Sequence, residues 1–126
     1  MNQTLSSLAS FTSAATLPQG QHIGVICASW HRDIVHRARD ALVAELARHG
    51  WPPDRVDHFD VPGAFEIPLQ AQRLARGGRH AAVVAIALVV DGGIYRHDFV
   101  AGSVVDAMMS VQLDNDVNVL SVVMKM

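Results

Sequence analysis

The strongest constraint on this chain is the alternation of short apolar runs with segments of helical periodicity. Residues 81–90 form an uninterrupted apolar run, and residues 23–28 form a shorter one. Runs of this length suit buried strands, and a strand that is apolar on both faces is typical of the centre of a parallel sheet. After the first run, apolar residues at every fourth position indicate a helix: Ile34, Ala38, Leu42 and Leu46.

The whole pattern predicts four strands separated by three helices in one α/β domain. We expect strands at residues 23–28, 55–60, 81–90 and 117–124, and helices after Ser29, which would cap the first, and over about 64–76 and 95–113. This order predicts a parallel sheet with right-handed crossovers. Residues 1–20 carry no charged side chain and are expected to form a loose tail, with the α/β domain at residues 21–126.

Composition excludes several classes of function. The 126 residues suit a single domain. With a formal charge of −2 and no basic stripe, the chain lacks the footprint of a nucleic-acid binder. The apolar runs are too short to cross a membrane, and the N-terminus lacks a secretory pattern. A single cysteine, Cys27, excludes an internal disulfide and favours a reducing compartment, so we expect a cytoplasmic protein. The histidine spacing predicts no metal site.

Three loops fall at the carboxyl ends of the predicted strands, where ligands bind in open α/β sheets. These loops are residues 29–31, 61–66 and 91–97, and they suit a flat polar ligand together with an anion. Each signal has an alternative. Trp30 is either a stacking platform or a residue packed on the rim, Phe65 could belong to the core, and Glu66 could simply favour a helix dipole. The Gly92-Gly93 pair suits anion binding or an ordinary turn, and Arg96-His97-Asp98 could be a solvated face.

Two strings in these loops resemble the lumazine synthase family of riboflavin biosynthesis. They are Val61-Pro62-Gly63-Ala64-Phe65-Glu66-Ile67-Pro68 and Asp91-Gly92-Gly93-Ile94-Tyr95-Arg96-His97-Asp98-Phe99-Val100, and the second is similar to the family's rhizobial-type second branch. The resemblance spans about residues 22–123. It implies a flavodoxin-like α/β/α sandwich on a four-stranded parallel sheet. It also implies a homo-oligomer, a pentamer or a multiple of it, with the site between subunits.

The resemblance implies a condensation without cofactor or metal. The family joins 5-amino-6-(D-ribitylamino)uracil to 3,4-dihydroxy-2-butanone 4-phosphate, giving 6,7-dimethyl-8-ribityllumazine, phosphate and water. Gly93 and Ile94 would bind phosphate through backbone N–H groups, and Ser121 would contact the pyrimidine from a neighbouring subunit. The ring and ribityl chain would be held by Trp30, Ala64, Phe65, Glu66, Leu88, Val89 and Val90.

The chain departs from the family pattern in two places. Arg96 stands where the common form has its proposed proton carrier, a histidine, and His97 follows one residue later. Arginine stays protonated near neutral pH, so Arg96 would neutralise charge, while His97 could carry protons if its ring reaches the site. Family members also continue past the last strand into a helical segment. We therefore expect a C-terminally short chain with bare apolar surface and impaired activity, or alternatively a catalytically silent lumazine- or flavin-binding or assembly protein.

Overall fold

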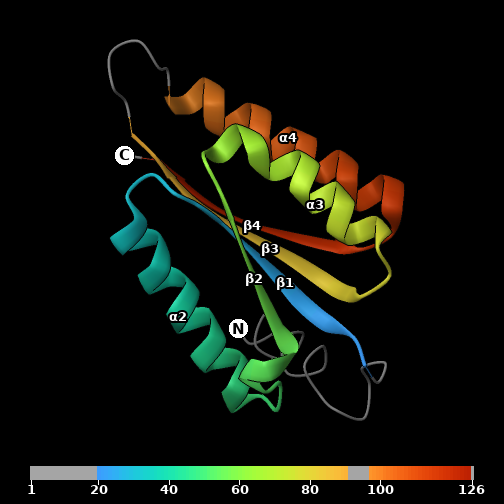
Figure 1. The fold of residues 1–126 in the computed structure, drawn as a ribbon. Helices are drawn as coiled ribbons and strands as arrows, with labels where there is room; N and C mark the ends of the chain where they lie inside the picture. Colours follow the sequence, from blue (N-terminus) through green and yellow to red (C-terminus); the bar gives the residue numbers. More distant parts are fainter. Residues whose placement is uncertain (1–19, 91–96, 126) are drawn as a thin grey trace, which may run out of the picture.

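The computed structural model describes residues 20–90 and 97–125 and shows a parallel sheet between two layers of helices (Figure 1). The sheet has four strands in the order β2-β1-β3-β4. The predicted α/β class and the four-stranded parallel sheet are confirmed. The elements in chain order are β1 (His22–Ala28), α2 (Arg32–Arg48), η1 (Pro53–Arg55), β2 (Val56–Val61), η2 (Ala64–Glu66), α3 (Ile67–Arg76), β3 (His80–Val89), α4 (His97–Asn115) and β4 (Asn118–Lys125).

Two interior strands carry most of the core. In β1, Ile26 lies opposite Phe59 of β2 and Ala85 of β3, and Ala85 in turn lies opposite Ser121 of β4. Since β1 and β3 have neighbours on both sides and helices over both faces, their side chains must be apolar almost throughout. This explains the long apolar run of the sequence, because all of β3 except Ala81 is buried.

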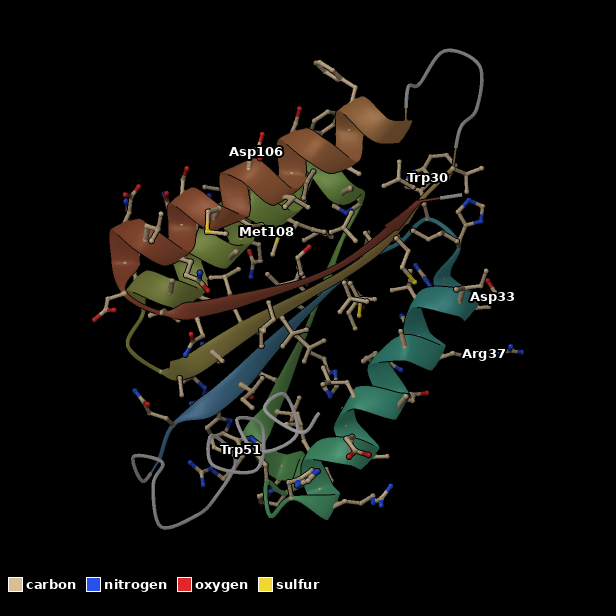
Figure 2. All side chains as sticks on the ribbon, turned by 180° about the vertical axis from the view of Figure 1, so that it is seen from behind. Trp30, Asp33, Arg37, Trp51, Asp106 and Met108 are labelled. Carbon is tan, nitrogen blue, oxygen red and sulfur yellow. The ribbon has the colours of Figure 1, made fainter. Side chains whose placement is uncertain are left out.

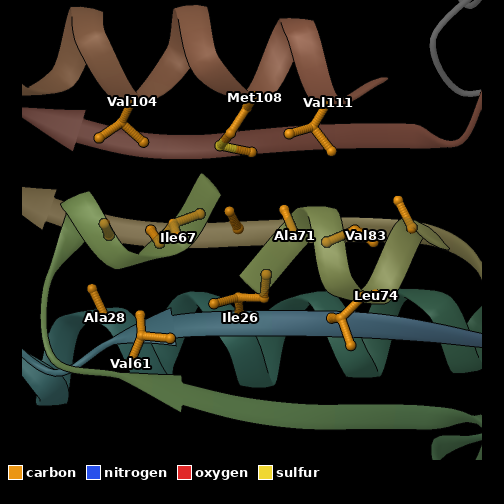
Figure 3. Packing of buried hydrophobic residues seen from close by; sticks show 13 residues of the cluster. Ile26, Ala28, Val61, Ile67, Ala71, Leu74, Val83, Val104, Met108 and Val111 are labelled. Atoms are coloured by element: carbon orange, nitrogen blue, oxygen red, sulfur yellow. The ribbon is translucent and has the colours of Figure 1, made fainter. Parts of the chain in front are cut away.

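The helices form separate apolar cores on the two faces of the sheet. One core joins α3 and α4 to the sheet through residues such as Ile67, Val104 and Met108 (Figure 3). The other lies under α2 and includes Val35 and Trp51. The Trp51 side chain is 1% exposed, and its indole Nε1 donates a hydrogen bond to the Arg55 carbonyl at 2.9 Å. The guanidinium of Arg55 also lies 4.3 Å from the centre of the indole ring.

The predicted start of the first helix is wrong in its cap and in one core position. Ser29 does not cap α2, since its hydroxyl donates a 2.9 Å hydrogen bond to the Val61 carbonyl instead. The N-cap is His31, which makes no side-chain capping bond. Ile34 is 39% exposed, whereas Val35 is fully buried. The other three positions of the expected face, Ala38, Leu42 and Leu46, do pack in the core under α2, so only its first position is wrong.

Smaller boundary shifts occur elsewhere in the chain. The second strand begins at Val56 because Arg55 belongs to the short helix η1, and the expected helix at 64 opens as the 3-10 turn η2. Pro68 stands in the first turn of α3, where its missing N–H disrupts no helical hydrogen bond. Within the described residues no helix is both long and apolar enough to cross a membrane.

One face of β4 is left open on the side that α2 covers elsewhere. Met124 of this strand packs against the core under α2, and side chains two apart in a strand share a face. On that face Leu120 is 53% exposed and Val122 is 38% exposed. The expectation of bare apolar surface beside the last strand therefore agrees with the structure at these two residues.

Candidate functional site

A cavity of about 500 Å³ lies at the carboxyl ends of the strands. Its lining begins with Ala28 at the end of β1 and with Trp30 and His31 just after it. The rest of the lining consists of residues 62–66 after β2, residues 88–90 at the end of β3, and Val100 of α4. The cavity therefore falls where an open α/β sheet is expected to bind ligands. Two of the three loops expected from the sequence supply most of its described walls.

The position of Trp30 is set by hydrogen bonds between the ends of β1 and β2. The backbone N–H and the hydroxyl of Ser29 both donate 2.9 Å hydrogen bonds to the Val61 carbonyl, so the ends of these strands are tied together. Trp30 comes directly after this tie, and its side chain is 70% exposed (Figure 2). An exposed indole on the wall of a cavity offers a free face for stacking on a planar ring.

The turn after β2 brings Glu66 close to Trp30. A Cβ atom built at Gly63 would lie 3.2 Å from Glu66 Oε2 and 3.7 Å from Trp30 Cδ1. The carboxylate and the indole therefore converge on the same glycine, and a larger residue there would crowd both. Phe65, which the sequence left open as a core residue, is 52% exposed and faces the cavity with Ala64.

The end of β3 supplies the apolar part of the wall. Leu88 and Val89 are buried, while Val90 is 36% exposed just beyond the strand. The three residues line the cavity together, as the resemblance implied for the ring and the ribityl chain. Their side chains offer only apolar contact, so any polar recognition here would come from the backbone.

Of the remaining predicted site residues, only Ser121 has a described side chain, and the relation of the others to the cavity stays a prediction. Gly93, Ile94 and Arg96 lie outside the described residues. His97 is the first residue of α4, and Val100 in the first turn of the same helix lines the cavity. Ser121 is exposed in the middle of β4, opposite Ala85, and does not line the cavity of its own chain.

His31 is a lining residue to which the sequence analysis gave no role. Its backbone is left-handed, with φ 56° and ψ 49°, and it ends the turn that carries Trp30. The sequence signal that could have indicated this role is the position of His31, directly after the candidate stacking residue Trp30 and between a predicted strand and a predicted helix. Pro62 and Gly63 also line the cavity.

The described lining of the cavity combines an exposed aromatic side chain with two ionisable side chains. Its ionisable lining residues are His31 and Glu66, and the other lining side chains are apolar or aromatic. Within residues 20–90 and 97–125 no group of three or more His, Cys, Asp or Glu side chains is arranged to hold a metal ion. The arrangement suits a flat polar ring that stacks on Trp30 and reacts by proton transfer.

Comparison with known proteins finds matches to one enzyme family. Residues 20–126 match the family model of 6,7-dimethyl-8-ribityllumazine synthase. Among curated proteins, the chain is 62% identical over 106 residues to a 6,7-dimethyl-8-ribityllumazine synthase of Rhodococcus erythropolis, covering 84% of this chain and 68% of the relative. It is 55% identical over 104 residues to a 6,7-dimethyl-8-ribityllumazine synthase 2 of Pseudomonas syringae pv. tomato, covering 82% of this chain and 61% of the relative.

A third relative gives the same result. It is a 6,7-dimethyl-8-ribityllumazine synthase 2 of Bradyrhizobium diazoefficiens, 53% identical over 105 residues, covering 82% of this chain and 62% of the relative. The chain thus spans between 61% and 68% of the length of these three curated relatives.

Proposed function

Because the chain belongs to the 6,7-dimethyl-8-ribityllumazine synthase family, we propose that it catalyses the reaction that gives the family its name. It would condense 5-amino-6-(D-ribitylamino)uracil with 3,4-dihydroxy-2-butanone 4-phosphate. The products would be 6,7-dimethyl-8-ribityllumazine, phosphate and water. The single observation that carries the proposal is the convergence of Trp30 and Glu66 on Gly63, at the wall of a cavity of about 500 Å³.

The roles of the cavity residues follow from their positions. The pyrimidine ring would stack on the exposed indole of Trp30, and the carboxylate of Glu66 beside it can accept hydrogen bonds from N–H or hydroxyl groups of the substrate. Ala64, Phe65, Leu88, Val89 and Val90 would enclose the ring and the ribityl chain. The family resemblance supports these roles independently of the geometry.

The chemistry needs positioning more than activation. The amine of the pyrimidine attacks the ketone, water leaves to give an imine, and phosphate is eliminated. The second nitrogen then adds to the carbonyl that this elimination leaves after tautomerisation, and the ring closes with loss of a second water. Both reactants are already reactive, so holding them in register supplies much of the rate. As the resemblance implies, Gly93 and Ile94 would bind the phosphate through their N–H groups. Arg96, which departs from the family pattern, would neutralise the phosphate or developing negative charge because arginine stays protonated.

Assembly is part of the proposal. Ser121 does not line the cavity of its own chain, so its proposed contact with the pyrimidine requires a neighbouring copy. The outer face of α4 supports association because it exposes large apolar side chains, with Phe99 68%, Met109 52% and Leu113 73% exposed. We propose a closed homo-oligomer, a pentamer or a multiple of it, whose sites lie between subunits.

Two finer assignments complete the proposal. The names of two relatives, both ending in "synthase 2", support a place in the second branch of the family. The single Cys27, which is buried and unpaired, suits a reducing compartment and supports a cytoplasmic enzyme.

Turnover tests the function directly. Purified protein, checked for folding by circular dichroism, is mixed with both substrates, and lumazine formation is followed by absorbance. We expect a rate above that of the uncatalysed condensation. A folded protein that gives only the background rate would overturn the enzyme proposal. Tight binding of the lumazine without turnover would then favour the silent binding protein, and binding of neither substrate nor product would favour an assembly subunit.

A further inference from the structure

The side chain of His31 belongs to the cavity wall and is left without a structural task. It lines the cavity directly after the stacking residue Trp30. Its ring makes no hydrogen bond or ion pair with any other described residue, and it does not cap α2. The other histidines near α2 do have partners, since His36 Nε2 lies 3.9 Å from Asp60 Oδ1 and His49 Nε2 lies 3.0 Å from Glu45 Oε2.

The backbone at His31 is left-handed and is held in place by hydrogen bonds. With φ 56° it adopts the left-handed conformation that glycine and asparagine adopt most readily. Its carbonyl accepts 3.1 Å hydrogen bonds from the N–H groups of Ile34 and Val35, which hold this turn at the start of α2.

The cavity also needs a group that both gives and takes protons. Glu66 is the other ionisable side chain among its described lining residues. A carboxylate in water is ionised near neutral pH and mainly accepts protons, whereas an imidazole changes its charge between about pH 5 and 8 and does both. Arg96, at the position of the family's proposed proton carrier, cannot release a proton at such a pH, and the side chain of His97, the other candidate from the sequence, lies outside what the structure describes.

We propose that His31 is the proton-transferring residue of the reaction described above, an inference that rests on the proposed function. Once the pyrimidine amine has added to the ketone, the imidazolium of His31 donates its proton to the carbinolamine hydroxyl. The C–O bond breaks, water leaves, and the nitrogen lone pair forms the C=N bond of a protonated imine. The neutral imidazole then takes the proton from the adjacent carbon. That electron pair forms a C=C bond and expels phosphate, which takes up a proton from solvent, and the imidazolium is restored.

Several charged or titratable groups lie near His31, on α2 and on the elements beside it. Arg32 and Asp33 follow it in the first turn of α2. His36 of that helix pairs with Asp60 at the end of β2, and the carboxylate of Glu66 belongs to η2. Among the described residues that line the cavity with His31, Glu66 is the one charged side chain.

Two variants separate chemistry from folding. His31→Asn and His31→Gly remove the imidazole but keep residues that accept the left-handed backbone, so both variants should fold. His36→Gln is the matched control, because it removes another imidazole of α2 that does not line the cavity. For each variant kcat and KM are measured from about pH 5 to 9, with circular dichroism as the check on folding.

We expect kcat of His31→Asn to fall about 100-fold with little change in KM, and the limb of the pH profile that belongs to the imidazole to disappear. Added imidazole should restore part of the activity of His31→Gly, and His36→Gln should behave as the wild type. A His31→Asn enzyme within about twofold of the wild type at every pH would overturn the inference alone. A rise in KM without loss of kcat, or a His31→Gly variant that imidazole does not restore, would also overturn it. Wild-type protein without turnover would instead overturn the proposed function, and this inference with it.

Discussion

The carboxylate of Asp57 and the buried imidazole of His80 join the starts of β2 and β3 through a 2.8 Å hydrogen bond between Oδ2 and Nε2. The same carboxylate accepts a 2.8 Å bond from Arg79 Nε and lies 3.1 Å from His22 Nδ1 at the start of β1. His80 Nδ1 is buried without a partner among the described residues, and His80 Nε2 is the donor to Asp57 because a carboxylate can only accept. Asp57 therefore ties three strands together at the edge of the sheet opposite the cavity.

Removing this carboxylate should destabilise the fold. In Asp57→Ala the buried N–H of His80 loses its acceptor, so the free energy of unfolding should fall by about 2–3 kcal/mol. Urea denaturation measures this change. Asp54→Ala is the control, because Asp54 is an exposed carboxylate in η1, and it should change stability by less than about 0.5 kcal/mol. Equal effects of the two substitutions would contradict a structural role for Asp57.

Acid should weaken the same link. The Arg79 guanidinium, with smaller contributions from His80 and His22, holds the pKa of Asp57 well below its usual range. A carboxyl group with a lowered folded pKa stabilises the fold above its unfolded pKa of about 4, and this contribution is lost as pH falls toward the folded value. Below about pH 4 the wild type should lose stability more steeply than Asp57→Asn. Parallel stability curves for the two proteins would count against this account.

A methyl group at Gly24 should not fit. A Cβ atom there would lie 2.9 Å from Leu74 Cδ1 and 3.2 Å from His80 Cδ2, so Gly24→Ala should cost about 1–3 kcal/mol. The matched variant Gly102→Ala adds its methyl to α4, where nothing lies within 4 Å, and should raise stability by up to about 1 kcal/mol. Opposite signs in thermal or urea unfolding are expected. A shared sign would mean that the neighbours of Gly24 move aside.

Trp30 should matter for binding and not for folding. Its indole is 70% exposed, so Trp30→Ala should leave the unfolding free energy almost unchanged. Lost stacking should weaken binding of the pyrimidine substrate about tenfold, whereas Trp30→Phe keeps an aromatic face and should lose much less. Isothermal titration calorimetry measures both affinities. Wild-type affinity in Trp30→Ala would remove this residue from the site.

Gly63→Ala tests the convergence of Trp30 and Glu66. The φ of −151° at Gly63 is available to any residue, so the substitution brings no backbone strain. Its methyl would lie 3.2 Å from Glu66 Oε2 and 3.7 Å from Trp30 Cδ1, which should shift the carboxylate. We expect unchanged stability and about fivefold weaker binding of the pyrimidine, equivalent to about 1 kcal/mol. Unchanged binding would show that Glu66 can move without effect on the ligand.

The sequence was most informative where burial leaves little choice of residue. β3 is apolar at almost every position because both its faces are covered, so its existence could be predicted from residues 81–90 within one residue at each end. The turn with Trp30 and the string around Glu66 could be placed at one edge of the sheet, since the carboxyl ends of parallel strands share that edge.

Features that depend on the order of the strands or on a single dihedral angle could not be predicted. His22, Asp57 and His80 are far apart in the chain and meet because β1 lies between β2 and β3, an order that periodicity does not determine. His31 has a left-handed backbone and α2 begins only at Arg32, and in its first turn Val35, not Ile34, lies in the core. Neither the cap of that helix nor the burial of Val35 in place of Ile34 leaves a signal in apolar spacing.

The two tryptophans lie at opposite ends of the molecule and in opposite surroundings (Figure 2). Trp51 is 1% exposed beneath the Arg55 guanidinium, while Trp30 is 70% exposed at the cavity. Their fluorescence should therefore divide by wavelength, with blue-shifted emission from Trp51 and water-like emission from Trp30. The two indoles should therefore report on different events. Quenching of the Trp30 emission should follow occupancy of the cavity, and a red shift of the Trp51 emission should follow unfolding.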